Sequence, residues 1–173
     1  MRVISGKYRG RVLASFEGRD IRPTADRVKE SLFNILSAQI ADAVVLDMFC
    51  GSGSLGIECL SRGAKFVQFN DISKDSLALL KKNLHGIADG YKISNCNYLN
   101  CVKPSDRFDI VFIDPPYALE YGNTALKLAA EVLNPNGVAV YERDRPFEGD
   151  VEGLEKVDER KYGKTYLSFF KTV

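Results

Sequence analysis

The sequence predicts an α/β fold built on a mostly parallel, seven-stranded sheet, and three observations lead to this prediction. Residues 44–56 contain a short apolar run, a glycine-rich turn and the start of an amphipathic helical pattern. Beyond them, apolar strand-like runs alternate with helical patterns, which is typical of parallel βαβ units. The chain ends with two runs, 154–162 and 165–172, joined by two residues, which is typical of an antiparallel hairpin.

The elements follow from periodicity and from turn residues. Besides the terminal hairpin, we expect strands at 44–47, 65–70, 91–96, 108–113 and 138–142, and helices at 54–62, 74–84 and 123–133. The run 108–113 is unbroken and apolar, as a strand covered on both faces requires. A turn is expected at 134–137, where Asn, Pro, Asn and Gly follow one another.

The amino-terminal part is expected to add a β-hairpin and a helix to this sheet. Residues 1–13 contain two short strands around a glycine-bounded basic turn. A helix begins in the segment 22–30, with Arg27 and Glu30 on its polar side. Its predicted apolar face consists of Val28, Leu32, Phe33, Ile35 and Leu36.

Length and charge indicate one domain with an asymmetric surface. A chain of 173 residues, 45% of them hydrophobic, is long enough for one well-buried core. We divide it into an amino-terminal extension, 1–41, and a core, 42–173. The totals of 24 basic and 23 acidic residues indicate no partner, but residues 1–30 carry a net charge of +4 and the remainder −3. This asymmetry favours a polyanionic partner at the amino end.

The four cysteines match no paired metal-ligand spacing, and no metal site is expected. We interpret Cys50, Cys59, Cys96 and Cys101 as small buried hydrophobes in a reducing compartment. The amino terminus has no apolar signal-like segment, and no apolar run reaches membrane-spanning length. We therefore expect a soluble, cytoplasmic protein without a membrane partner, and a monomer.

The glycine-rich turn predicts a nucleotide-type cofactor site. Gly51, Gly53 and Gly56 form the G-x-G-x-x-G pattern, which by itself is a weak signal. Asp47 stands four residues before the first glycine, where it would repel a pyrophosphate and attract a cationic ligand such as S-adenosylmethionine (AdoMet). An NAD-linked dehydrogenase is therefore disfavoured, while the simpler alternative is that Asp47 only caps the helix. Asp71, 20 residues after Gly51, is placed to accept from ribose hydroxyls.

The predicted cofactor site extends to neighbouring positions. The polar stretch 95–97, after the third strand, is expected to face the adenine. The full predicted set is Asp47, Phe49, Gly51, Ser52, Gly53, Asp71, Ile72 and Asn97.

A second signature, Asp114-Pro115-Pro116-Tyr117, follows the fourth strand. Two prolines stiffen this loop and remove backbone donors, so that it presents acceptors. The Asp114 carboxylate and the Pro115 carbonyl suit an exocyclic NH2 group, and Tyr117 suits stacking on a flipped base. Alone, the motif is more simply a strand-ending turn, but its place on the same sheet edge as Asp47 favours methyl transfer to a planar amine. We predict Asp114, Pro115 and Tyr117 as the catalytic residues.

Basic residues of the amino-terminal part, together with Tyr8 and Thr24, are the predicted nucleic-acid contacts. An aromatic residue between cations favours nucleic acid over an ordinary solvated hairpin, because stacking and phosphate contacts are used together. The predicted set is Lys7, Tyr8, Arg9 and Arg11 in the hairpin, with Thr24 and Arg27 at the start of the helix.

The sequence resembles the RsmD family of bacterial methyltransferases, which modify N2 of one guanine in small-subunit (16S) ribosomal RNA. The resemblance covers nearly the whole chain and lies in segments 6–10, 22–34, 47–56 and 114–117, of which 22–34 is specific to the family. It implies a Rossmann-like class I methyltransferase fold, AdoMet as cofactor, and an assembled or nearly assembled small subunit as substrate. It also implies the cofactor roles of Asp47, Gly51, Gly53 and Asp71, and the base-holding roles of Asp114 and Tyr117. Two positions depart from many relatives, Ser73 and Asn97, where an aspartate is common.

Three other functions are compatible with parts of the sequence. A DNA or RNA adenine-N6 methyltransferase would share both signatures, although the chain lacks length for a separate target-recognition region. A protein-glutamine methyltransferase would more naturally carry Asn in place of Asp114. A non-catalytic RNA-binding protein of the same fold is a further alternative, against which the intact Asp47, Asp71 and Asp114 argue.

Overall fold

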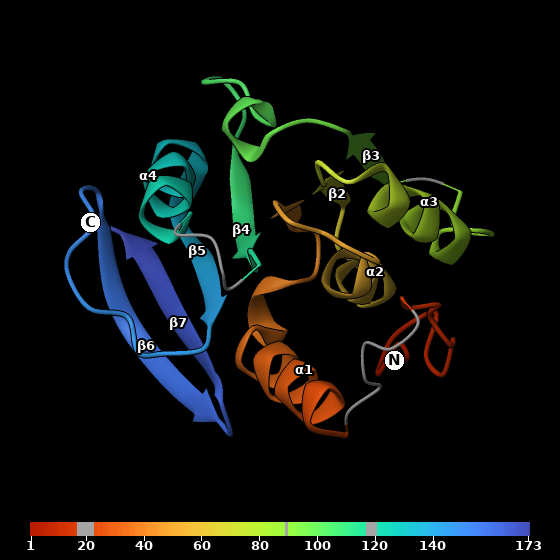
Figure 1. Cartoon of the computed structure of the whole chain (residues 1–173). Coiled ribbons are helices and arrows are strands. Elements are labelled where there is room, and N and C mark those ends of the chain that lie inside the picture. The colour runs from red at the N-terminus through yellow and green to blue at the C-terminus, as the bar shows by residue number, and fades with distance from the viewer. Residues whose placement is uncertain (17–22, 89, 117–120) are drawn as a thin grey trace.

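Seven strands of the described residues form one sheet in the order β3-β2-β1-β4-β5-β7-β6 (Figure 1). This computed structural model describes residues 1–16, 23–88, 90–116 and 121–173, with backbone alone for 23–25. The strands are β1 (Val44–Asp47), β2 (Phe66–Asn70), β3 (Tyr91–Ser94), β4 (Phe108–Ile113), β5 (Leu133–Arg143), β6 (Leu154–Tyr162) and β7 (Thr165–Thr172).

The pairing of the strands confirms the predicted mixed sheet. Strands β1 to β5 pair in parallel, whereas β7 runs antiparallel to both β5 and β6. The predicted strands 108–113, 154–162 and 165–172 are confirmed with the same bounds. Those predicted at 65–70 and 91–96 are present but shorter.

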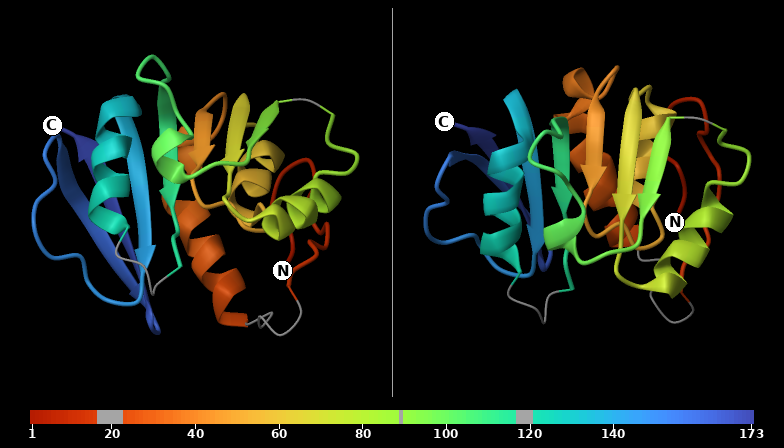
Figure 2. Two further views of the ribbon diagram at one scale, coloured as in Figure 1. Left: turned by 45° about the horizontal axis from the view of Figure 1, so that its top comes forward. Right: turned by 90° about the horizontal axis from the view of Figure 1, so that it is seen from above.

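Helices cover both faces of the sheet and create two apolar layers. The helices are α1 (Pro23–Ile35), α2 (Ser54–Ser61), α3 (Lys74–Asn83) and α4 (Gly122–Val132), with 3-10 turns η1 (Ser37–Gln39) and η2 (Tyr98–Asn100). Buried residues of α1, α2 and α3 pack on one face, and those of α4 and η2 on the other. Figure 2 shows α1 and α4 on opposite sides of the sheet. Successive residues of a strand point to opposite faces, so each central strand contributes to both layers.

Two local predictions differ from the structure. Ile35 was expected on the apolar face of α1 but is 39% exposed, whereas Lys29 is only 4% exposed. The buried stripe of α1 therefore includes a cation, which finds its partner on another helix. The turn expected at 134–137 is present as an irregularity within β5, where pairing with β4 stops at Leu133 and resumes at Val138. Asn136 has a φ of 68° there, in the left-handed region that Asn tolerates.

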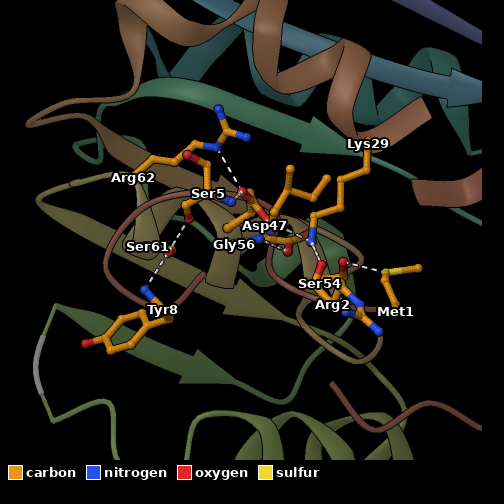
Figure 3. A network of polar contacts seen from close by, with 12 residues as sticks. Met1, Arg2, Ser5, Tyr8, Lys29, Asp47, Ser54, Gly56, Ser61 and Arg62 are labelled. Carbon is orange, nitrogen blue, oxygen red and sulfur yellow. Dashed lines mark hydrogen bonds and ion pairs between the residues drawn. The ribbon is translucent and has the colours of Figure 1, made fainter. Parts of the chain in front are cut away.

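The amino-terminal hairpin is present and lies along α2. Arg2 and Val12 form an isolated antiparallel bridge at its base. At its tip the N–H of Lys7 donates to the Ser61 carbonyl at 2.7 Å. The N–H of Tyr8 donates to the Ser61 hydroxyl at 2.9 Å (Figure 3). A Cβ on Gly6 would lie 1.8 Å from the Ser61 carbonyl oxygen, so only glycine permits this approach.

Glu58 of α2 anchors the same hairpin from inside the protein. Its carboxylate is fully buried and accepts from the backbone N–H groups of Ile4 at 2.9 Å and Ser5 at 3.0 Å. It also forms ion pairs with Lys29 of α1 at 3.0 Å and with Arg62 at 2.8 Å. In Figure 3 these two cations approach the network from opposite sides. One carboxylate thus joins the hairpin, α1 and α2.

Within the described parts of the chain, no helix is both long enough and apolar enough to span a membrane.

Candidate active site

Three aspartates end neighbouring strands at the carboxyl edge of the sheet. Asp47 is the last residue of β1, Asp71 follows β2, and Asp114 follows β4. Strand β1 lies between β2 and β4, so the three lie on adjacent strands as the sequence predicts. The first turn of α1 lies toward the same edge (Figure 2). Ligands of open α/β sheets bind at this edge.

The glycine loop leaves open space beside Gly51. This residue has a φ of +53°, and a Cβ built on it would meet nothing within 4 Å. Its N–H donates to Asp71 Oδ2 at 2.9 Å, which fixes the loop against the end of β2. The backbone at Gly51 is therefore both rigid and accessible, as a nucleoside-type ligand that approaches a loop requires.

The other two glycines have a packing role. A Cβ on Gly53 would lie 2.2 Å from Leu80 Cδ1, and one on Gly56 would lie 2.2 Å from Phe69 Cε1. Gly53 belongs to the predicted cofactor set, whereas Gly56 is predicted only as part of the G-x-G-x-x-G pattern. At both positions glycine is needed because α2 packs closely on α3 and β2.

Asp47 is almost fully buried beneath this loop. It is 2% exposed, and its Oδ2 accepts from the N–H of Gly56 at 3.1 Å. Burial raises the pKa of Asp47 to about 7, although the Gly56 N–H opposes this shift and the nearby Asp71 charge adds to it. The helix-capping contact, which the sequence left as the simpler alternative, is thus present. A cationic ligand nearby would favour the ionised carboxylate.

Asp71 holds the loop and still faces the edge of the sheet. Besides Gly51, the N–H of Ser73 donates to its Oδ1 at 2.8 Å. A carboxylate offers about four acceptor positions, so ribose hydroxyls remain compatible with these contacts. Ile72, beside it, is 69% exposed. The Asn95 amide donates to the carbonyls of both Asp71 and Ile72, at 2.9 and 3.0 Å, and so fixes this segment.

The segment after β3 presents a second exposed apolar side chain near the expected adenine. Asn97 is exposed, but its Oδ1 accepts from the N–H of Leu99 at 3.0 Å and caps η2. Leu99 itself is 51% exposed. The side chain of Asn70 fixes the segment from below by donating to the carbonyls of Met48 and Cys96, each at 3.2 Å. Sequence reasoning missed Leu99, whose signal is an apolar residue in a polar stretch.

Three aromatic rings from distant segments meet at the edge. Phe49 and Tyr98 have ring centroids 5.2 Å apart, as do Tyr98 and Tyr121, while Phe49 and Tyr121 lie at 6.3 Å with nearly parallel planes. Of these, only Phe49 was predicted. The cluster joins the glycine loop, η2 and the start of α4.

Ser52, also predicted, has its carbonyl bonded by the Asn83 amide at 2.9 Å, which ties the loop to the end of α3.

The Asp-Pro-Pro segment follows β4 directly. Asp114 is half-buried, Pro115 is buried and Pro116 is exposed. The predicted stacking residue, Tyr117, lies outside the described residues.

The predicted RNA-contact residues are separated in space. Lys7, Tyr8 and Arg9 lie at the carboxyl-terminal end of α2, one helix length away from the glycine loop. The guanidinium of Arg11 donates to the carbonyl of His85, after α3. A further group lies in the first turn of α1, which carries Thr24 and Arg27.

That turn of α1 holds a buried acceptor. Asp26 Oδ1 is buried and has no hydrogen-bond partner among the described residues. The side chain of Thr24 lies outside the described part, and Arg27 is exposed. Among the described residues, no group of three or more His, Cys, Asp or Glu side chains could hold a metal ion.

The fold and the arrangement of this edge define a class I methyltransferase. The solved structure described as putative methyltransferase yhhF from Escherichia coli superposes with a TM-score of 0.89 at 30% identity, covering 99% of this chain and 97% of the other. That of putative methylase HI0767 from Haemophilus influenzae gives a TM-score of 0.81 at 32% identity, covering 100% and 98%.

The sequence comparisons give the family. Residues 1–171 match the family model described as conserved hypothetical protein 95. The chain is 40% identical over 157 residues to ribosomal RNA small subunit methyltransferase D of H. influenzae, covering 85% of this chain and 81% of that protein. It is 36% identical over 181 residues to putative rRNA methyltransferase YlbH of Bacillus subtilis, covering 99% and 98%. The chain belongs to this family, the RsmD family, as the sequence resemblance predicted.

Proposed function

We propose that this chain transfers a methyl group from AdoMet to the exocyclic N2 amine of a guanine in small-subunit (16S) ribosomal RNA. One observation carries the proposal: the open loop at Gly51, fixed by Asp71, lies on the same sheet edge as Asp114 and on adjacent strands. The names of the relatives support small-subunit ribosomal RNA as the substrate.

The residues at the glycine loop fit AdoMet. Asp71 would accept from its ribose hydroxyls, and the exposed side chains of Ile72 and Leu99 would cover its adenine. The buried Asp47 carboxylate would compensate its positive charge. When bound, AdoMet supplies an electrophilic methyl group on a sulfonium. The residues of the chain bind it and exclude water.

The segment 114–117 would hold the amine that receives the methyl group. The Asp114 carboxylate and the Pro115 carbonyl would accept its N–H bonds, and Tyr117 would stack on the base. On transfer the N2 nitrogen would form a bond to the methyl carbon as the sulfur–methyl bond breaks; S-adenosylhomocysteine would leave, and the proton lost by the nitrogen would pass to water through the Asp114 carboxylate that accepts its N–H bond. The Asp114 carboxylate stabilises the developing positive charge on nitrogen, and positioning supplies the remaining acceleration. No histidine or cysteine nucleophile is needed.

The proposed substrate is an assembled or nearly assembled small subunit. The protein would act on it in the cytoplasm as a monomer. The hairpin tip with Lys7 and Arg9 is one helix length from the loop that binds the cofactor. It would therefore bind phosphates remote from the reacting base, which suits a large particle.

The test is to incubate the protein with labelled AdoMet and hypomethylated small subunits, and then to identify the modified nucleoside by mass spectrometry. N2-methylguanosine in 16S RNA is the expected product. N6-methyladenosine would identify the rival enzyme class, and no transfer together with no AdoMet binding by calorimetry would indicate a binding protein.

A second test uses Asp114→Ala, which removes the acceptor for the amine. Single-turnover methylation of the particle at saturating AdoMet should slow by about 100-fold or more. AdoMet affinity and the thermal midpoint should change little. Asp75→Ala, at an exposed position of α3, is the matched control. A folded Asp114→Ala protein with a near-normal rate would mean that the amine is held elsewhere.

A further inference from the structure

The terminal hairpin carries cations to the same edge of the sheet as the proposed active site. Strand β7 begins where β5 ends, because the two run antiparallel and Arg143 pairs with Tyr166. Tyr166 in turn pairs with Lys161 of β6, and Lys164 lies in the turn between the two strands. In Figure 1 this turn projects at the same end of the molecule as the first turn of α1.

Arg143, Tyr166 and Lys161 form a row across β5, β7 and β6, which we call the edge row. Residues directly opposite each other in an antiparallel pair point to the same face, so the three side chains share one face of the sheet. It is the face covered by α4, because Arg143 lies over the rings of Tyr141 and Phe147, which pack in that layer.

Aromatic rings hold both cations of the edge row without neutralising them. The Lys161 Nζ lies 5.3 Å from the ring centroid of Tyr166, and the Arg143 guanidinium lies 5.4 Å from that of Tyr141. A ring attracts a cation through its quadrupole but carries no net charge. Within the described residues neither cation forms an ion pair, and the buried Nε of Arg143 has no hydrogen-bond partner. The edge row thus presents positive charge that the protein leaves uncompensated.

The other two basic residues of β6 are compensated. Arg160 and Lys156 each form an ion pair with an acid of the same strand, at 2.9 and 3.6 Å. Lys161 and Lys164 are exposed, and no acid among the described residues pairs with either of them. The uncompensated charge of β6 and its turn is therefore confined to the end near the reacting edge.

A cavity of about 300 Å³ lies between the edge row and the proposed base-holding segment. Arg143 lines it from β5, and Pro115 lines it just after β4. Lys161 is three strands away from this segment, about 14 Å at the usual spacing between strands. One RNA strand covers such a span with a few nucleotides.

The loop that follows Arg143 is unsuited to a phosphate. Residues 144–150 contain three acids, Asp144, Glu148 and Asp150, against Arg145 alone. Net negative charge repels a phosphate backbone. An RNA strand that enters the cavity is therefore directed along the edge row toward β6.

We propose that the edge row and Lys164 bind the backbone of the RNA strand on one side of the target guanine. Lys161 and Lys164 contact its phosphates, and the guanidinium of Arg143 donates to the phosphate nearest the base. The inference rests on the proposed function and adds a second RNA surface to it, at the reacting edge rather than at the remote tip with Lys7 and Arg9. Phosphate contacts beside the target fix the position of its nucleotide, whereas remote contacts fix only the particle.

The first measurement is the salt dependence of particle binding. Lys161→Gln combined with Lys164→Gln should reduce the log–log slope by about 1.5 units, because each lost contact to a single strand contributes about 0.7. Lys171→Gln is the matched control, since Lys171 belongs to the same hairpin but pairs with Val138 at the opposite edge of the sheet. It should leave the slope unchanged. Thermal melting and AdoMet calorimetry should give wild-type values for both proteins.

The second measurement locates the contact on the RNA. Tyr166 is replaced by the photo-crosslinking residue p-benzoylphenylalanine, which keeps an aromatic ring, and the crosslinked nucleotide is mapped by primer extension. It should lie within about five nucleotides of the methylated guanine. The same replacement at Tyr8, beside the remote tip, should give no crosslink to those nucleotides.

An unchanged slope in the folded double variant would overturn the inference, as would a crosslink from position 166 that maps only to distant nucleotides. If the double variant does not fold, the crosslink decides. If the wild-type protein binds the particle but transfers no methyl group, the proposed function fails. The slope comparison then still decides whether the edge row binds RNA.

Discussion

Two buried carboxylates, Glu58 and Asp47, lie close to α2 but have opposite surroundings. Glu58 receives two backbone N–H groups and two side-chain cations. Burial alone would raise its pKa, but the Ile4 N–H, followed by Lys29 and Arg62, holds the pKa of Glu58 below its usual value. The protein itself thus provides every partner that a buried anion needs.

Asp47 is almost as deeply buried as Glu58. Among the described residues, the hydrogen bond that its carboxylate accepts comes from the N–H of Gly56. Burial raises the pKa of Asp47 to about 7, so the free protein holds it near half-ionised at neutral pH. Glu58 and Asp47 are similarly buried, so burial alone does not distinguish their roles. A carboxylate whose partners are complete joins elements together, whereas an under-compensated one at a sheet edge is suited to a cationic ligand.

The largest expected effect is at Glu58. Glu58→Gln leaves the ammonium group of Lys29 buried without its counter-charge, and should lower the free energy of unfolding by about 3–5 kcal/mol. Urea unfolding at pH 7 measures this loss. Glu155→Gln, on the exposed side of β6, should change the value by less than about 0.5 kcal/mol. A loss below about 1 kcal/mol for Glu58→Gln would contradict the anchoring role.

Neutralising Asp47 should increase the stability of the free protein, whereas neutralising Glu58 should decrease it. Its pKa is raised in the folded state, so the wild-type protein loses stability as pH rises from about 4 to about 7, and the loss then levels off. Asp47→Asn removes this titration and should therefore stabilise the free protein by up to about 4 kcal/mol at pH 8, but much less at pH 4. Unfolding curves at both pH values measure the difference. An Asn variant that is less stable at pH 8 would refute the interpretation.

AdoMet affinity provides a further test of the difference between Asp47 and Glu58. Asp71→Ala and Asp47→Asn should each weaken AdoMet binding by about 1–3 kcal/mol, as expected for a charge-assisted contact. Wild-type affinity should fall as pH drops below about 7, because Asp47 must then lose a proton to bind a cation, and this dependence should vanish in Asp47→Asn. Calorimetry between pH 6 and 8 tests both points. Unchanged affinity in both variants would exclude this pocket.

The smallest effect is expected at the hairpin tip. Replacing Lys7 and Arg9 by Ala should reduce the salt dependence of particle binding by about 1.5 units of log–log slope and leave AdoMet binding intact. Arg11 is kept, because its guanidinium bonds the His85 carbonyl and its loss would disturb the fold. An unaltered slope would assign the tip a purely structural role.

The sequence by itself determined the strands, their alternation with helices and the residues at the strand ends. The run 108–113 and the terminal hairpin have the predicted bounds, because apolar periodicity and turn residues act over short distances. Asp47, Asp71 and Asp114 were placed on one edge for a similar reason: consecutive parallel strands end at the same side of a sheet.

Only the tertiary structure decided which buried polar groups meet. Nothing within the 13 residues of α1 indicates that Lys29 points inward while Ile35 is exposed, because the partner of Lys29 stands 29 positions later on α2. The Phe49–Tyr98–Tyr121 cluster and the edge row likewise depend on register and helix packing. Periodicity specifies the face on which a side chain lies, but its partner is set by contacts between segments far apart in the chain.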